Sequence, residues 1–293
     1  MDLHEQKAEF AAEFGLASDL EVMQRQAAER RQVLRWLLAG VATIPLASCG
    51  GSADADVAST VTTATGTGST ATATPTAGSC AVIPEETAGP YPADGSNTNG
   101  GSIINVLNQS GVVRSDIRAS FNGATGVAAG VPLTIKLQLV NANTSCASLA
   151  GYAVYLWHCD RDGLYSLYSS GVTAQNYLRG VQESDSSGNL SFTTIFPGCY
   201  AGRMPHVHFE VYPSLARAAT ASSRIKTSQF TFPLATLNEV YTASGYATSV
   251  RNLAQISYAT DNVFSDGTSL QMASVSGNAV DGYVVTLTIG VNG

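Results

Sequence analysis

The chain has 293 residues, of which 44% are hydrophobic and only 13% are charged. It is therefore long enough to form one large domain or two small ones with a substantial core, and its composition is not that of a disordered protein. The chain carries 15 Lys and Arg residues against 22 Asp and Glu residues, a net charge of -7. No basic surface large enough to follow a phosphate backbone is expected, so nucleic-acid binding is excluded as a predicted function.

The first 49 residues have the pattern of an export signal. A twin-arginine pair at residues 30–31 precedes an apolar run at 36–46, which is too short to cross a bilayer but has the length of a signal-peptide core. Small residues then lead into Cys49, as in the cleavage site of a lipoprotein. We predict that residues 1–49 are a leader with twin-arginine and lipoprotein signals, and that lipidated Cys49 anchors an exported protein to the membrane. Export by the general secretory route and a start at Met23 remain open alternatives.

The segment after Cys49 is a predicted tether. Residues 50–79 consist mainly of Ser, Thr, Ala and Gly and contain no Lys, Arg or aromatic residue. Such a segment cannot bury enough apolar surface to offset the entropy lost on ordering. A single folded domain is then expected from residue 80 to residue 293.

Within that domain, apolar and polar residues alternate with a period of two. Leu133–Leu139 and Val285–Val291 show the pattern most clearly, which predicts half-buried strands. The sequence thus predicts an all-β domain, an antiparallel β-sandwich with short helices and long loops. Shorter strands are expected at Ala153–Trp157, Leu190–Phe196, Val207–Tyr212 and Gln229–Phe232, and short helices at Leu234–Tyr241 and Thr248–Ile256.

The sharpest chemical feature is the pair His206 and His208, separated by one residue in a predicted strand. Residues i and i+2 of a strand point to the same face, so the two imidazoles are able to bind one metal ion. On its own the pair is weak evidence, because such histidines are more often surface residues or hydrogen-bonded core residues.

The surroundings of this pair resemble a known family. Two stretches, 157–166 and 196–205, together with other segments, are similar to those of the intradiol ring-cleavage dioxygenases, the catechol and protocatechuate 3,4-dioxygenase family, and in particular to its secreted lipoprotein branch. The matching segments are 86–91, 112–117, 149–151, 157–160, 163–166, 178–180, 194–200, 202–203, 206–208 and 229–230.

The resemblance implies a β-sandwich core and a mononuclear, non-haem Fe(III) centre. Carried over residue by residue, the family's two tyrosinate ligands fall on Tyr165 and Tyr200, and its two histidine ligands on His206 and His208. This ligand set agrees with coordination chemistry, because phenolate oxygens are hard anionic donors that favour ferric over ferrous iron. For tyrosines considered alone, a packing role is the more common one.

The resemblance also implies roles around the metal. An aromatic diol would bind the iron and react with O2 to give a cis,cis-muconate, with Tyr200 accepting a proton from the substrate. Arg203 matches an arginine that stabilises negative charge on the ring, Gln229 matches a glutamine of the pocket, and Tyr91 resembles a tyrosine that reaches the active site in some relatives. Their alternatives are a surface salt bridge for Arg203, a polar contact in a strand for Gln229 and a place in the core for Tyr91.

Four cysteines lie in the predicted domain. Position 199 is a cysteine where many relatives have Trp or His, which makes the wall beside Tyr200 smaller. An even number of cysteines in an exported domain suggests two disulfides, with three pairings that the sequence does not distinguish. The four are Cys80, Cys146, Cys159 and Cys199.

Two rival functions remain open at this stage. His158 together with His206 and His208 would make a three-histidine site for zinc or copper. Alternatively, the sandwich is a non-catalytic lipoprotein domain for ligand binding or adhesion, because a fold does not determine activity. The predicted partners are an aromatic diol, O2 and the membrane, and a homodimer is left open.

Overall fold

The structure is a computed structural model that describes residues 80–293. The leader, Cys49 and the tether predicted for residues 1–79 lie outside the described residues. Within the described domain, no helix has the length and apolar character needed to cross a membrane.

The first of two large sheets is organised around its longest strand, β3 (Pro132–Asn141). On one side β3 pairs in parallel with β11 (Gly282–Val291), which pairs antiparallel with β10 (Ser274–Asn278). On the other side β3 pairs antiparallel with β7 (Asn189–Ile195) and, further along, with β4 (Ala147–Ser148). The parallel pairing of β3 and β11 is a departure from the fully antiparallel sandwich that the sequence suggested.

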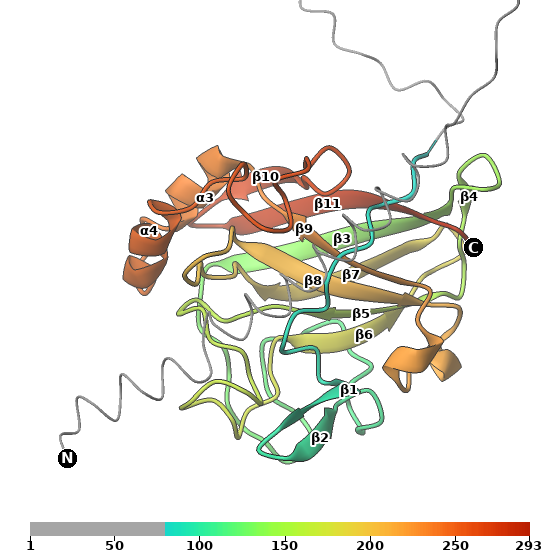
Figure 1. The fold of residues 1–293 in the computed structure, drawn as a ribbon, viewed down its shortest axis with the longest axis horizontal. Coiled ribbons are helices and arrows are strands. Elements are labelled where there is room, and N and C mark those ends of the chain that lie inside the picture. Colours follow the sequence, from blue (N-terminus) through green and yellow to red (C-terminus); the bar gives the residue numbers. More distant parts are fainter. Residues whose placement is uncertain (1–79) are drawn as a thin grey trace, which may run out of the picture. The chain divides into compact units, whose positions relative to one another are not determined.

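The second large sheet has four antiparallel strands. Its order is β6 (Arg179–Glu183), β5 (Ala153–Trp157), β8 (His206–Tyr212) and β9 (Lys226–Thr231). Every residue of β5 and β8 is buried, so both faces of this sheet are covered. The two sheets lie face to face in Figure 1 and form an open β-sandwich.

The remaining elements are short and lie around the sandwich (Figure 1). A small hairpin precedes the first sheet in the chain, and the two α-helices found within residues 80–293 follow β9. These elements are β1 (Asp94–Asn99), β2 (Ser102–Asn105), η1 (Leu215–Arg217), η2 (Ala221–Ser223), α3 (Leu234–Val240) and α4 (Ala247–Leu253).

The second sheet separates two buried clusters. Val154, Leu156 and Phe209 point toward the first sheet and pack with residues of β3 such as Ile135 in the main core. The alternate residues of the same strands point the other way, into a second cluster covered by loops and the β1–β2 hairpin. Such alternation is the ordinary consequence of a pleated strand. Here it separates the main core from a second interior on the far side of the sheet.

The all-β prediction is confirmed, and so are the strands expected from alternation. β3, β5, β7, β8, β9 and β11 all overlap predicted runs, α3 lies within its predicted helix, and α4 begins one residue before the helix predicted at Thr248–Ile256. The sequence analysis missed β6 and β10 as well as the β1–β2 hairpin. These strands contain polar residues or glycine at positions where an apolar residue would have produced the alternation of apolar and polar residues.

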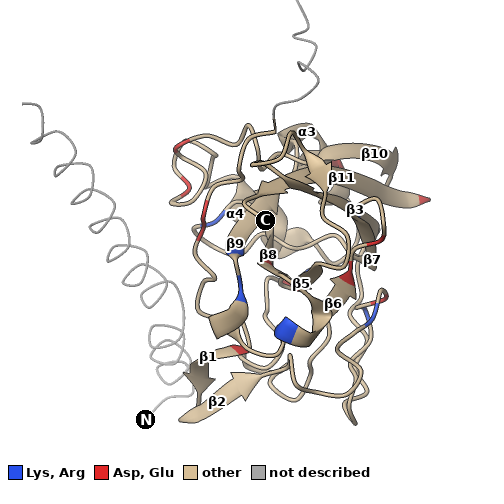
Figure 2. Cartoon of the chain, turned by 90° about the vertical axis from the view of Figure 1, so that its right-hand side faces the viewer, with Lys and Arg blue, Asp and Glu red and all other residues tan. Residues whose placement is uncertain are grey.

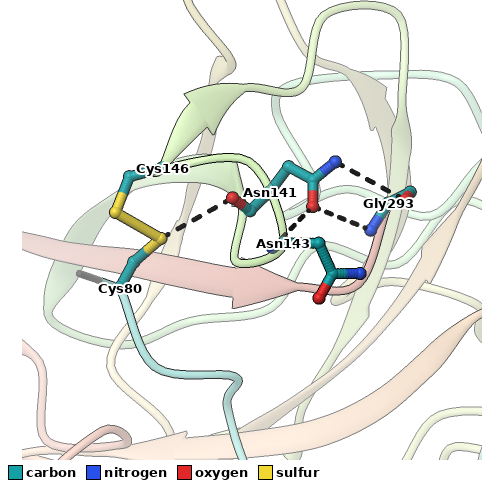
Figure 3. Close-up of a disulfide and its surroundings, with 5 residues drawn as sticks. All are labelled: Cys80, Asn141, Asn143, Cys146 and Gly293. Atoms are coloured by element: carbon teal, nitrogen blue, oxygen red, sulfur yellow. Dashed lines mark hydrogen bonds between the residues drawn. A yellow bond between two sulfur atoms is a disulfide. The ribbon is translucent and has the colours of Figure 1, made fainter. Parts of the chain in front are cut away.

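One disulfide joins Cys80 to Cys146, which lies in the β3–β4 connection (Figure 3). Next to it, the side chain of Asn141 accepts a hydrogen bond from the backbone N–H of Asn143 at 2.9 Å and one from Gly293 at 3.3 Å. The disulfide therefore fixes the start of the described domain close to its C-terminal end.

The prediction of a second disulfide was wrong, because Cys159 and Cys199 are both free and buried. Their thiols contact different carbonyls: Cys159 Sγ lies 3.5 Å from the Gly198 oxygen, and Cys199 Sγ lies 3.4 Å from the Arg203 oxygen. Burial raises the pKa of both thiols, that of Cys199 to about 12, so neither is a reactive thiolate at neutral pH.

Charged residues are sparse over the described domain (Figure 2). Exposed pairs such as Arg118–Asp116, at 2.7 Å, contribute little to stability, at most about 1 kcal/mol. One ion pair differs in kind: Arg203 and Asp261 are 3.0 Å apart and only 3% and 0% exposed. A buried pair of this sort is costly to desolvate, which draws attention to its surroundings.

Candidate metal centre

His206 and His208 lie on β8 and point to the same face of the sheet, away from the main core. Both are nearly inaccessible, and their Nε2 atoms are 3.0 Å apart. Burial lowers the pKa of both imidazoles well below the ordinary value. The pair is therefore neutral at physiological pH, which is the protonation state in which imidazole binds a metal.

Neighbouring groups fix the orientation of the two rings. Nδ1 of His206 lies 2.6 Å from the Met204 carbonyl oxygen, so Nδ1–H donates a hydrogen bond and the Nε2 lone pair stays available. The His208 ring stacks on Trp157, with centroids 5.0 Å apart and planes inclined by 3°. Each histidine is thus held with Nε2 directed toward the same point.

Two tyrosines from separate loops reach that point. Tyr165 follows β5 in the chain and Tyr200 precedes β8, and the hydroxyl oxygen of each lies 3.4 Å from Nε2 of His206. Tyr165 is buried, whereas Tyr200 is partly exposed. Four potential ligand atoms, two phenol oxygens and two imidazole nitrogens, therefore converge on one small volume.

Two glycines permit this close approach. Gly163 has φ +85°, and a Cβ atom there would lie 2.9 Å from Cβ of Tyr200. Gly89 has φ +67°, and a Cβ atom there would lie 3.3 Å from Cε1 of His208. A side chain at either position would be strained and would press on Tyr200 or His208. Gly89 of segment 86–91 and Gly163 of segment 163–166 therefore have a physical role beside the site.

The donor set fits a ferric ion. Two phenols that ionise on binding supply hard anionic oxygens, and two neutral imidazoles complete a set that favours Fe(III). Among residues 80–293, no group of three or more His, Cys, Asp or Glu side chains is placed to hold a metal. A ferrous site with two histidines and a carboxylate therefore has no counterpart in the described domain.

The three-histidine alternative with His158 was wrong. Both ring nitrogens of His158 are engaged elsewhere: Nδ1 lies 2.7 Å from the Cys159 carbonyl oxygen and Nε2 lies 2.7 Å from Oγ1 of Thr194. Burial lowers its pKa to about 4, so the ring is neutral and hydrogen-bonded within the protein. His158 is a structural histidine of the sandwich interior.

Arg203 and Gln229, both singled out from the sequence, are brought together behind the four donors. The Arg203 guanidinium donates to Oε1 of Gln229 at 2.7 Å, and the Gln229 amide donates to the Thr87 carbonyl at 2.8 Å. Burial by itself lowers the pKa of Arg203, but the charges of Tyr200 and Asp261 outweigh this effect and the pKa is raised. Arg203 therefore stays protonated, and its positive charge lies close to Tyr200.

Asp261 was missed by the sequence analysis. Its Oδ2 accepts hydrogen bonds from Nε of Arg203 at 3.0 Å and from the Met204 N–H at 2.7 Å. Its Oδ1 accepts from the N–H groups of Val263 at 2.8 Å and Phe264 at 3.1 Å. A lone aspartate in a loop far along the chain gives no signal in sequence, although it fixes both Arg203 and the segment leading to His206.

Tyr91 and Cys199 occupy different places. The Tyr91 ring lies 4.9 Å from the Tyr165 ring and 5.2 Å from that of Tyr168, so it is beside the site rather than in the main core. Cys199 instead packs in the main core with Met204 and other apolar residues. Its small side chain therefore does not form a wall of the site.

Comparisons with known proteins bear on the class and the fold of this domain. Residues 113–225 match the family model described as Dioxygenase, a span that contains Tyr165, Tyr200, His206 and His208. The structure is similar to that of the intradiol ring-cleavage dioxygenase from Tetranychus urticae, with a TM-score of 0.55 and 23% identity over 73% of this chain and 95% of that chain. The predicted resemblance and the dioxygenase class are thereby confirmed.

Two further solved structures are more distant. The dioxygenase domain of a carbohydrate-binding fusion protein from Streptomyces sp. SirexAA-E matches with a TM-score of 0.44 and 22% identity over 72% of this chain and 99% of that domain. Catechol 1,2-dioxygenase from Pseudomonas arvilla C-1 matches with a TM-score of 0.36 and 20% identity over 60% of this chain and 56% of that one. The assignment of the fold rests on the first comparison.

Proposed function

Because the chain carries a dioxygenase-family domain with the fold of an intradiol ring-cleavage dioxygenase, we propose that it is an exported, Fe(III)-dependent intradiol dioxygenase. Its substrates are catechol-type aromatic diols and O2, and its products are cis,cis-muconates. The observation that carries the proposal is the convergence of the two phenol oxygens of Tyr165 and Tyr200 with the Nε2 atoms of His206 and His208.

Each donor has a definable task in this proposal. Tyr165, Tyr200, His206 and His208 would hold the ion. A ferric ion held by these residues would supply electron withdrawal, which would make the oxygen-bearing ring carbons of the diol reactive toward O2. The backbone carbonyl of Met204 keeps the proton of His206 on Nδ1, so Nε2 remains a ligand atom throughout.

The two tyrosines differ in a way that supports distinct roles. Tyr165 is 2% exposed and surrounded by other aromatic rings, whereas Tyr200 is partly exposed and has Gly163 rather than a larger side chain against its Cβ. We therefore assign the proton-accepting role to the Tyr200 oxygen, which is the one that an incoming diol is able to reach. Tyr165 remains a fixed ligand.

Arg203 supplies fixed positive charge to the anionic substrate. Its guanidinium is held from two sides by Asp261 and Gln229, so it needs no reorganisation when negative charge develops. Gln229 acts through this contact and through its bond to Thr87. Tyr91 contributes an aromatic surface next to Tyr165 that suits a planar ring.

The proposal is tested on the purified full chain by metal analysis, visible absorption and product identification. We expect bound iron, a visible tyrosinate-to-iron band, and conversion of catechol to a colourless cis,cis-muconate that contains both atoms of one O2. Tyr200→Phe should shift or weaken the band. Tyr246→Phe is the matched control, because its hydroxyl bonds to Phe196 and Val131 in the main core, and it should leave the band unchanged.

Other products would point elsewhere. Yellow muconic semialdehyde as the main product would overturn the assignment, because it arises from cleavage beside the two hydroxyl groups. Absence of oxygen uptake across a broad panel of catechols, with iron bound, would favour the binding-module alternative.

The location of the enzyme is a separate proposal that rests on the sequence before residue 50. We propose that the protein is exported and held at the membrane by lipid on Cys49, because acyl chains contribute about 0.8 kcal/mol per buried CH2 group. Cys49→Ser should move the protein from the membrane fraction to the soluble fraction. A variant that still sediments with membranes would show that the anchor is not this cysteine.

A further inference from the structure

Arg179, the first residue of β6, is a buried cation that the proposed reaction does not use. It is 1% exposed, and its guanidinium donates to Oγ of Ser166 at 3.1 Å, the Ser166 carbonyl at 3.0 Å, the Pro92 carbonyl at 3.1 Å and the Tyr155 hydroxyl at 3.1 Å. None of its hydrogen bonds or ion pairs within residues 80–293 is with a carboxylate. A buried charge held only by neutral oxygens is expensive, so its retention requires a reason.

The residues that Arg179 binds adjoin site residues. Ser166 directly follows Tyr165, and Pro92 directly follows Tyr91. The two segments are far apart in the sequence, and one guanidinium joins them. Arginine suits this task because its donors form a rigid planar fork that bonds in several directions at once.

The same residue is tied to the histidine strand through the sheet register. Arg179 is paired with Trp157 across β5 and β6, and Trp157 is paired with His208 across β5 and β8. The three side chains therefore stand in one row on one face of the sheet. Because Trp157 also stacks on His208, the row connects the Arg179 clamp to a ligand ring.

All three segments that meet at Arg179 contain a strained residue. Ala93 has φ 54°, Leu167 has φ 73° and Leu178 has φ 57°, and these are three of the six non-glycine residues with positive φ in the described domain. Leucine rarely adopts this conformation, which persists only where the surroundings enforce it. The strain is thus concentrated where the guanidinium bonds hold the backbone.

We propose that Arg179 is a positioning residue for the metal centre: it clamps the turn after Tyr165 and the segment after Tyr91 to the strand row that ends at His208. This inference rests on the proposed function, because it takes Tyr165 and His208 as ligands. The clamp sets where the Tyr165 oxygen lies relative to the two histidines. Arg179 itself does not touch substrate.

The test compares iron binding by the full-length apoprotein of wild type and variants, using iron alone as the probe. Arg179→Lys keeps the charge but cannot bond to both segments, so iron affinity should fall about 10- to 100-fold, as when other groups that orient metal ligands are removed. The visible band at full iron loading should also shift. Ser166→Ala and Tyr155→Phe each delete one contact while keeping Arg179, and should show smaller changes in the same direction.

Arg118→Lys is the matched control. Arg118 pairs with Asp116 at 2.7 Å on the surface and bonds to none of the segments that Arg179 joins. It should leave iron affinity and the band unchanged, which separates positioning from the general effect of an arginine-to-lysine change.

Wild-type iron affinity and an unshifted band in Arg179→Lys would overturn the inference and leave the proposed function intact. If Arg179→Lys does not fold, unchanged iron binding and an unshifted band in both single-contact variants would overturn it equally. Wild-type protein that binds no iron would overturn both proposals.

Discussion

The two faces of the four-stranded sheet are built from alternate residues of the same strands, yet they differ completely in chemistry. Toward the first sheet, β5, β8 and β9 present mainly apolar side chains to the main core, although Ser228 of β9 is buried on the same face, opposite Phe209. Toward the loops, the same strands present histidine, tryptophan, tyrosine, glutamate and glutamine. The first set is Val154, Leu156, Val207, Phe209, Val211 and Phe230, and the second includes Tyr155, Trp157, His206, His208, Glu210 and Gln229.

The histidines show what this difference means. His158 is bonded to Thr194 of β7 and has both ring nitrogens engaged, whereas His206 and His208 direct Nε2 toward each other and toward two phenols. Burial lowers the pKa of all three. Burial therefore does not distinguish a structural histidine from a candidate metal ligand, but the partners of its nitrogens do.

Adjacent residues of β8 provide the strongest test of the two faces. His208→Ala should lose nearly all bound iron, because one of four donors is removed. Val207→Ala should retain iron but lower the free energy of unfolding by about 1–3 kcal/mol through lost packing. Metal analysis and denaturant unfolding measure the two effects. Iron retained in His208→Ala would contradict the assignment of metal binding to the sheet face that carries His206 and His208.

The disulfide should affect stability alone. Cys80 and Cys146 are 66 residues apart, and a crosslink closing a loop of this length contributes about 4 kcal/mol in the chain-entropy account. The double Cys→Ser variant should therefore unfold at lower denaturant concentration while binding iron normally. If the variant loses iron binding but keeps its stability toward denaturant, the disulfide acts on the site rather than on the fold.

His158 gives a pH-dependent test of the structural face. Its pKa is about 4 in the folded domain, below the ordinary 6.5, so the unfolded chain binds more protons between these values. Its contribution to stability is present above pH 6.5 and is lost as the pH falls toward 4, a change of about 3 kcal/mol. The slope of unfolding free energy against pH in this window should be smaller in His158→Gln. An equal slope would mean that other groups dominate.

Asp261→Asn keeps the shape of the side chain but leaves the buried Arg203 guanidinium without its carboxylate partner. Arg203 would be held less firmly, and kcat should fall about tenfold with iron retained and little change in KM. Asp281→Asn, at an exposed position, is the control and should leave kcat unchanged. A rise in KM without a change in kcat would place the role of Asp261 in substrate binding instead.

The strands that could be predicted from sequence are those with one face in the main core. Leu133, Ile135, Leu137 and Leu139 alternate because every second residue of β3 is buried in that core. The β6 strand begins with Arg179 and Gly180 and ends with Gln182 and Glu183, so its residues carry no such period. Alternation therefore identifies half-buried strands and misses those whose buried side chains are polar.

The site was only partly accessible from sequence for a similar reason. The spacing of His206 and His208 places both on one strand face without further knowledge. Tyr165 and Tyr200 lie in loops, where no periodicity fixes direction, so only the resemblance to a family singled them out. Asp261 belongs to no periodic pattern and to no segment that resembles the family. Its role follows from a tertiary contact that brings distant loops together.

The position of the disulfide has a mechanical consequence. The segment from Cys80 runs beside β11, where the Ile83 N–H bonds to Gly290, passes β9, where the Glu86 N–H bonds to Thr227, and reaches Gly89 against His208. A pull applied through the preceding chain arrives first at Cys80, and the crosslink to Cys146 passes it into the body of the first sheet (Figure 3). Without that bond the same force would break the hydrogen bonds of the segment one after another, toward His208. The Cys80–Cys146 disulfide would thus keep tension applied to the preceding chain from reaching the site.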